Sequence, residues 1–122
     1  MDKSYESEMT IHTFIAVCNR WDIGRWDALN LLGYTPESEY ASNILMGYYP
    51  ITDPEIRLRI SLVLGISMSL ECLFDGSIEA EREWLRTSRE CLGGESPIDH
   101  MIRKGLDNIE NVVELAYKER GL

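Results

Sequence analysis

The sequence contains few cysteines and histidines, the residues that form disulfides and zinc sites. Its 122 residues include three cysteines, Cys18, Cys72 and Cys91, and two histidines, His12 and His100. The cysteine count is odd and no two cysteines are spaced as C-x-x-C, so neither a disulfide framework nor a zinc site is indicated. We therefore predict no metal site and no cofactor.

The sequence also lacks a long apolar run. No segment approaches the roughly 18 apolar residues that a membrane-spanning helix needs. The first residues, Met1–Glu6, lack the basic and apolar regions of a signal peptide. We expect no membrane association and a cytoplasmic location, with one compact domain or two small modules sharing a core.

Basic side chains are outnumbered by acidic ones. Twelve Lys and Arg stand against 21 Asp and Glu, a formal net charge of −9, and acids exceed bases in both halves of the chain. This charge repels phosphate, which disfavours non-specific nucleic-acid binding, and it suits a basic protein partner. Charge alone leaves open the alternative that it only keeps the protein soluble.

The spacing of apolar residues predicts an all-α protein. After a polar segment expected to fray, residues 1–8, five residues follow the spacing of a helix with one buried face: Ile11, Phe14, Ile15, Cys18 and Trp21. A second short helix would turn Trp26, Leu29 and Leu32 inward and end at Gly33. Thr35-Pro36 predicts the start of a third helix, and the three together suggest a helix-turn-helix bundle.

The segment after Asp53-Pro54 is ambiguous. Apolar residues alternate with others from Leu58 to Cys72, the period of a strand, but such a strand would be far too long. The same residues also fit helical spacing. We predict two consecutive buried helices, broken near Gly65-Ile66 and ended by Asp75-Gly76.

The remaining sequence predicts three further helices. Residues 78–87 form an amphipathic helix with Ile78, Arg82 and Leu85 near one line and Trp84 beside it. Ser96-Pro97 caps a short helix that stops at Gly105. In the last helix, Asp107 and Glu110 form a capping box, and the inner face has four apolar residues: Ile109, Val112, Val113 and Ala116.

The sequence from Trp84 onward resembles the toxin-binding domain of the Xre/MbcA/ParS antitoxins. The shared features are a tryptophan-bearing helix, the segment Gly93-Gly94-Glu95-Ser96-Pro97, a short helix, Gly105, and a final helix ending near Gly121. The upstream part is similar to the Xre-type helix-turn-helix of the same proteins at Trp21, Leu31-Leu32-Gly33, Arg59–Ile66 and Leu73-Phe74. The expected modules are residues 1–76, a helix-turn-helix domain, and residues 77–122, a toxin-binding domain.

The resemblance implies the antitoxin of a type II toxin–antitoxin system. Its partner would be a RES-domain toxin that consumes NAD or transfers ADP-ribose, blocked at the entrance of its NAD site. The resemblance also implies a homodimer that represses its own operon. Contacts to the toxin would come from the last turn of the final helix and a short tail extending past it: Tyr117, Glu119, Arg120, Gly121 and Leu122.

The sequence has few side chains suited to contact DNA bases and phosphates in the predicted helix-turn-helix. The predicted third helix, Pro36–Met46, would present three polar side chains outward: Ser38, Ser42 and Asn43. It has no Lys or Arg, and Glu37 and Glu39 would face the phosphates, which argues against autonomous DNA binding. The nearest cations to contact phosphate are in neighbouring helices: Arg20, Arg25, Arg57 and Arg59.

No pattern of a catalytic site is present. Asp99 and His100 are adjacent, and adjacent residues on a helix point apart, so Asp99 is not placed to orient His100. We expect His100 to be a surface side chain and the protein not to be an enzyme. The alternative functions are a stand-alone helix-turn-helix transcriptional regulator and a structural adaptor dimer.

Overall fold

The computed structural model is all-α, as predicted. It describes residues 3–34, 43, 46, 53–103 and 105–122, and none of these forms a strand. The predicted third helix lies almost entirely outside the described residues. The described elements are α1 (Lys3–Arg20), α2 (Arg25–Leu32), α4 (Pro54–Phe74), α5 (Ile78–Arg86), the short 3₁₀ helix η1 (Glu90–Leu92), α6 (Pro97–Ile102) and α7 (Leu106–Glu119).

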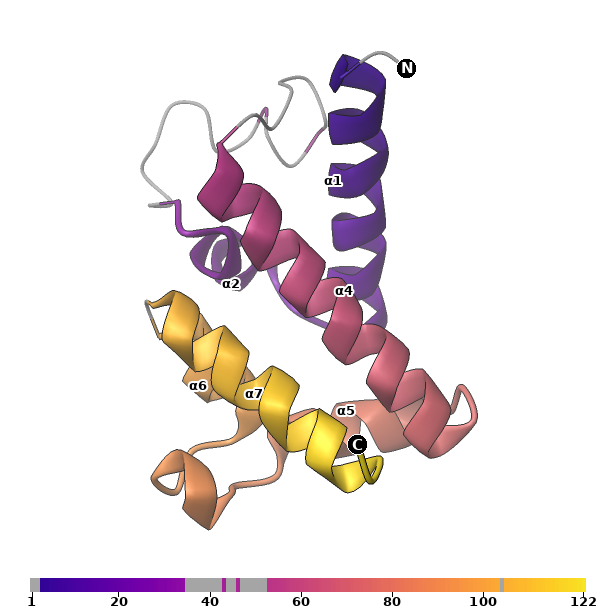
Figure 1. Ribbon diagram of the computed structural model, residues 1–122, viewed down its shortest axis with the longest axis vertical. Coiled ribbons are helices and arrows are strands. Elements are labelled where there is room, and N and C mark those ends of the chain that lie inside the picture. Colours follow the sequence, from indigo (N-terminus) through magenta and orange to yellow (C-terminus); the bar gives the residue numbers. More distant parts are fainter. Residues whose placement is uncertain (1–2, 35–42, 44–45, 47–52, 104) are drawn as a thin grey trace.

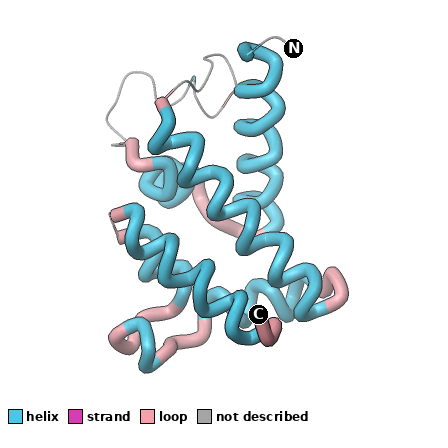
Figure 2. Tube along the Cα trace, viewed as in Figure 1, coloured by secondary structure: helices cyan, strands magenta, loops and turns pink. Residues whose placement is uncertain are grey.

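The longest helix, α4, crosses the molecule between α1 and α7 (Figure 1). It packs against α1, α2, α5 and α7, while α6 packs against α2, α5 and α7. One hydrophobic cluster joins residues of both predicted modules, from Ile11 in α1 to Ala116 in α7. Figure 2 shows α6 and α7 side by side below α2, so the C-terminal helices complete the core begun by the N-terminal ones.

The predicted helix ends are largely confirmed. The Asp53 carboxylate accepts hydrogen bonds from the backbone N–H groups of Glu55 and Ile56, and Pro54 follows it at the first position of α4. Ser96 caps α6 in the same way. Gly33 ends α2 with φ +89°, a conformation in which a side chain would be strained.

The predicted break near Gly65-Ile66 is wrong, because α4 is one helix of 21 residues. Its buried residues lie three or four apart on a single face throughout: Ile56, Arg59, Ile60, Val63, Ile66, Ser69 and Leu70. This continuous face packs against neighbours on both sides of Gly65, and helical hydrogen bonding through the glycine costs less than interrupting that packing.

Three local predictions at other helices are also corrected. Trp26 is 62% exposed, because α2 buries Ala28, Leu29, Leu31 and Leu32 on the opposite side. α1 begins at Lys3, within the segment expected to fray. α7 begins after Gly105, at φ +133°, two residues before the expected cap Asp107, and no side chain caps it.

A buried ion pair joins α5 to the end of α1. Glu81 is fully buried, and both of its oxygens accept hydrogen bonds from Arg20, at 3.0 Å from Nε and 2.7 Å from Nη2. Arg20 also donates to the Gly76 carbonyl at 3.0 Å. Ile78, predicted to lie near one line with Arg82 and Leu85, is 42% exposed, whereas the Glu81 carboxylate is buried on the inner face of this helix together with Leu85.

Two further arginines of α5 satisfy carbonyl groups at the C-terminal end of α1. Arg82 Nε donates to the Arg20 carbonyl at 2.8 Å, and Arg86 Nη2 donates to the Trp21 carbonyl at 2.6 Å. The last carbonyls of a helix have no partner within it and carry partial negative charge, so guanidinium groups are well suited to this position. The end of α1 is therefore fixed to α5 by charge as well as by packing.

We predict that Gly65→Ala raises the free energy of unfolding by about 1 kcal/mol, because alanine favours the interior of a helix over glycine. A Cβ at this position would meet nothing within 4 Å, whereas at Gly33 it would lie 3.2 Å from Arg59 under a positive φ. Gly33→Ala, the control, should therefore destabilise. Urea unfolding of both variants at low protein concentration measures this, and a destabilised Gly65→Ala would contradict an uninterrupted α4.

We predict that Arg20→Ala lowers the free energy of unfolding by about 3 kcal/mol, because it leaves the buried Glu81 carboxylate without its cation. The control is Lys118→Ala, which removes an exposed ion pair with Glu114 and should cost about 0.5 kcal/mol or less. Chemical denaturation of both variants compares the two losses. Equal losses would show that the Arg20–Glu81 pair contributes no more than a surface pair.

Candidate partner-binding site

The motif residues of the C-terminal half come together around Trp84. Its ring is 5% exposed, and its Nε1 donates a hydrogen bond to the Glu119 carboxylate in the last turn of α7. The Arg89 guanidinium lies 5.1 Å from the centre of the Trp84 ring, and its Nη1 is 3.5 Å from Glu119 Oε1. These contacts attach the end of α7 to α5.

The residues after α7 do not extend as the predicted tail but turn back onto the helix. The N–H of Gly121 donates to the Lys118 carbonyl and that of Leu122 to the Tyr117 carbonyl, each at 3.0 Å. Gly121 has φ +82°, the left-handed conformation that such a helix ending requires. Arg120 Nη1 donates to Ser69 Oγ on α4 at 3.1 Å, which fixes this turn to the central helix.

The five predicted contact residues therefore divide into two groups. Glu119 and Arg120 hold the end of α7 against α5 and α4 through the contacts just described. Tyr117 and Leu122 face outward, with exposed fractions of 42% and 73%, and the hydrogen bond between their backbones keeps them together. Gly121 connects the two groups. Tyr117 and Leu122 therefore form an exposed apolar pair on a backbone that the contacts of Glu119 and Arg120 hold in place.

A cavity of about 290 Å³ lies beside this attachment point. Its lining combines the aromatic and cationic groups of Trp84 and Arg89 with four residues of α4, α5 and the following turn: Phe74, Ala80, Glu83 and Thr87. Arg89 was not among the predicted site residues, because no spacing in the sequence indicates that it stacks on Trp84. Its place becomes evident only in the fold, where the guanidinium lies over the Trp84 ring.

The glycine-rich segment forms the turn that the sequence predicts. Gly93 and Gly94 have φ values of +70° and +89°. The Arg89 N–H donates to the Glu95 carbonyl at 2.9 Å, which closes the loop, and Ser96 and Pro97 then begin α6. This turn therefore sets the direction in which α6 begins, and α6 then packs against α7.

His100 is 7% exposed, so its predicted surface position is wrong. Its Nδ1 lies 3.1 Å from Glu95 Oε1, and its Nε2 lies 3.1 Å from the Asn111 side-chain amide. Arg103 donates to the same Glu95 oxygen at 2.6 Å. The ring is buried because α7 covers α6, and polar partners on both sides satisfy its nitrogens. Asp99, in contrast, is exposed.

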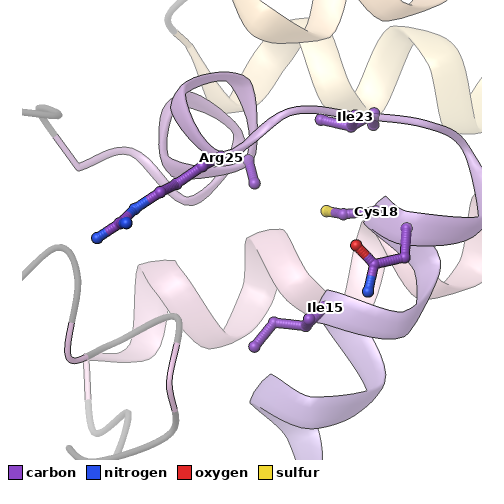
Figure 3. A pocket seen from close by; sticks show the side chains of 6 residues that line it. Ile15, Cys18, Ile23 and Arg25 are labelled. Carbon is purple, nitrogen blue, oxygen red and sulfur yellow. The ribbon is translucent and has the colours of Figure 1, made fainter.

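Only some of the residues predicted to contact DNA are described. Ser38 and Ser42 lie outside the described residues, whereas Asn43 is half-buried. Arg25 lies at the rim of a cavity of about 150 Å³ between α1 and α2, into which Ile15 and Cys18 project (Figure 3). Burial raises the pKa of the Cys18 thiol to about 12, so it stays protonated.

Two of the other cations considered for phosphate contact are used within the fold. Arg20 pairs with Glu81, and Arg59 is 7% exposed beneath Gly33, with Glu55 at 3.6 Å. Among the described residues, no group of three or more His, Cys, Asp or Glu side chains is arranged to hold a metal ion. In the same part of the chain, no helix combines the length and apolar character needed to cross a membrane.

No protein-family model matches the chain, and no curated protein matches it closely enough to count as a relative. The likeness to the Xre/MbcA/ParS antitoxins consequently stays a prediction from the motifs.

We predict that Glu95→Gln reduces stability at neutral pH but much less in acid. Hydrogen bonding from His100, together with the charge of Arg103, holds the pKa of the Glu95 carboxyl below its ordinary value of 4.5. A lowered folded-state pKa contributes stability above the unfolded-state pKa, and this contribution is lost as the pH falls through the folded-state pKa. Urea unfolding of both proteins at pH 7 and pH 3 measures the difference, and a gap between them that is unchanged at pH 3 would contradict this.

Proposed function

We propose that this chain is a binding protein, not an enzyme, and that it acts as the antitoxin of a type II toxin–antitoxin system. The observation that carries the proposal is the exposed pair Tyr117 and Leu122, presented on a turn whose backbone is fixed by Gly121 and by the contacts of Glu119 and Arg120. An apolar surface that is rigid before binding loses little conformational entropy when a partner covers it.

The partner we propose is a RES-domain enzyme that consumes NAD or transfers ADP-ribose, with both proteins in the cytoplasm. The support for this choice is the resemblance of the motifs at Trp84, Gly93–Pro97 and Gly105 to those of the Xre/MbcA/ParS antitoxins. In the fold, Trp84 also holds the end of α7 through its hydrogen bond to Glu119. The turn at residues 120–122 would cover the entrance of the partner's NAD site, with Tyr117 and Leu122 in contact with its rim. The net charge of −9 would favour encounter with a basic rim.

The alternative, a stand-alone transcriptional regulator, has less support. DNA binding needs cations on the surface that faces the phosphates, and both Arg20 and Arg59 are engaged by carboxylates of this chain. Repression of the operon is therefore a secondary proposal, for which the partner would have to supply positive charge.

We predict that the double variant Tyr117→Ala with Leu122→Ala weakens binding to the proposed RES-domain partner roughly thirtyfold, the loss of about 2 kcal/mol expected for an aromatic hot spot. Calorimetric titration measures the affinity, and an assay of NAD consumption measures the inhibition. The fold should be retained, because both side chains are exposed.

The matched control is Ile78→Ala on α5, which removes a side chain with the same 42% exposure as Tyr117 and should leave the affinity unchanged. A second variant, Gly121→Val, places a branched side chain at φ +82° and should weaken binding by distorting the turn. Full inhibition by all three variants would exclude the end of α7 as the binding surface.

A further inference from the structure

The cavity beside Trp84 is separate from the surface proposed to bind the enzyme. Neither Tyr117 nor Leu122, the exposed apolar pair of that surface, belongs to its lining. Its volume is about 290 Å³, whereas a cavity of about 150 Å³ is large enough to bind benzene. The cavity therefore has room for an apolar ring together with several further atoms.

One part of the lining is apolar. Phe74, half-buried at the end of α4, and Trp84 of α5 contribute aromatic rings, and Ala80 contributes a methyl group. Pockets that bind small molecules combine such apolar walls with a few polar groups that fix the orientation of the ligand. An apolar side chain placed against these rings would remove their surface, and its own, from water.

The polar part of the lining contains two opposite charges that do not pair with each other. Arg89 pairs with Glu119 at 3.5 Å, whereas Glu83 forms no ion pair within the part of the chain that the structure describes. Its carboxylate is thus available to a positively charged ligand group. Thr87, beside it, donates its hydroxyl proton to the Glu83 carbonyl at 2.7 Å, so the hydroxyl oxygen can still accept a hydrogen bond.

The hydrogen bonding of the Arg89 guanidinium is incomplete. Its Nη2 donates to the Trp84 carbonyl at 3.4 Å, its Nη1 lies 3.5 Å from Glu119 Oε1, and its Nε is buried without a partner. A guanidinium has five N–H groups, so two long contacts leave most of them unused. A ligand carboxylate at the Nη groups would add charge-assisted hydrogen bonds, which are the strong ones.

We propose that this cavity binds a free α-amino acid with an apolar side chain. Arg89 contacts the ligand carboxylate, and Glu83 and Thr87 contact its ammonium group. The ligand side chain lies against the rings of Phe74 and Trp84. A zwitterion suits this protein better than a simple anion, because it carries no net charge and is not repelled by the net charge of −9.

The binding is weak, because the ligand is small. The binding energy typical of one ligand atom gives a dissociation constant on the order of 1 mM for phenylalanine. In an NMR titration of the ¹⁵N-labelled chain with L-phenylalanine to about 20 mM, the indole N–H signal of Trp84 should shift. The signal of Trp26, which is 62% exposed, should not, whereas non-specific stacking would move it as well. An unchanged Trp84 signal, or equal shifts of both signals, would overturn the proposal.

Derivatives of phenylalanine test the two charges of the ligand. Phenylalaninamide lacks the carboxylate, and N-acetylphenylalanine lacks the ammonium group, so each should bind at least about tenfold more weakly than phenylalanine. Free glycine keeps both charges but has no side chain to contact the rings, and it should also bind at least about tenfold more weakly. Affinity equal to that of phenylalanine for any of the three would refute the proposed mode of recognition.

Glu83→Gln should weaken the binding of phenylalanine about tenfold, because it removes the charge that faces the ammonium group. The fold should be retained, since Glu83 is exposed. The matched control is Glu110→Gln, which removes an exposed carboxylate of α7 outside the cavity and should leave the affinity unchanged. Equal losses in the two variants would contradict a contact with Glu83. These experiments use the chain alone, so their outcome does not depend on the proposed enzyme.

Discussion

The packing of α1, α2, α5 and α7 against α4 requires α4 to remain one straight helix over 21 residues. Its buried residues form a single face from Ile56 to Leu70. A break at Gly65 would turn the two halves of that face in different directions and expose part of the core. Apolar burial is the largest favourable contribution to folding, so the free energy gained by burying this face outweighs the cost of a glycine in the middle of the helix.

The C-terminal helices depend on polar contacts as much as on this core. Arg20 and Glu81 connect the end of α1 to α5, Glu119 connects α7 to Trp84 and Arg89, and His100 lies between Glu95 and Asn111 beneath α7. Each of these contacts joins side chains of two different segments. Such networks need all their members in place, so they fix the orientation of α5, α6 and α7 relative to one another.

This rigidity bears directly on the proposed function. A surface that is ordered before binding loses less conformational entropy when a partner covers it. The turn at residues 120–122 is held by backbone hydrogen bonds, by Arg120 on α4 and by Glu119 on α5.

The all-α class, most helix boundaries and the turns can be predicted from the amino-acid sequence alone. Asp53-Pro54, Ser96-Pro97 and the glycines at positions 33 and 93 act on the backbone within a few residues, so their effect is readable without knowing what lies nearby.

Which side chains are buried, and which of them contact one another, follows from the packing of the helices and could not be predicted locally. The sequence predicts that Trp26 faces inward and that His100 lies at the surface. In the structure the tryptophan is exposed, and the histidine is buried under α7. The fold also brings Glu81 to Arg20 and Arg89 onto Trp84. These outcomes depend on how whole helices pack, and the cost of burying a charged or polar group is met by partners contributed from distant parts of the chain.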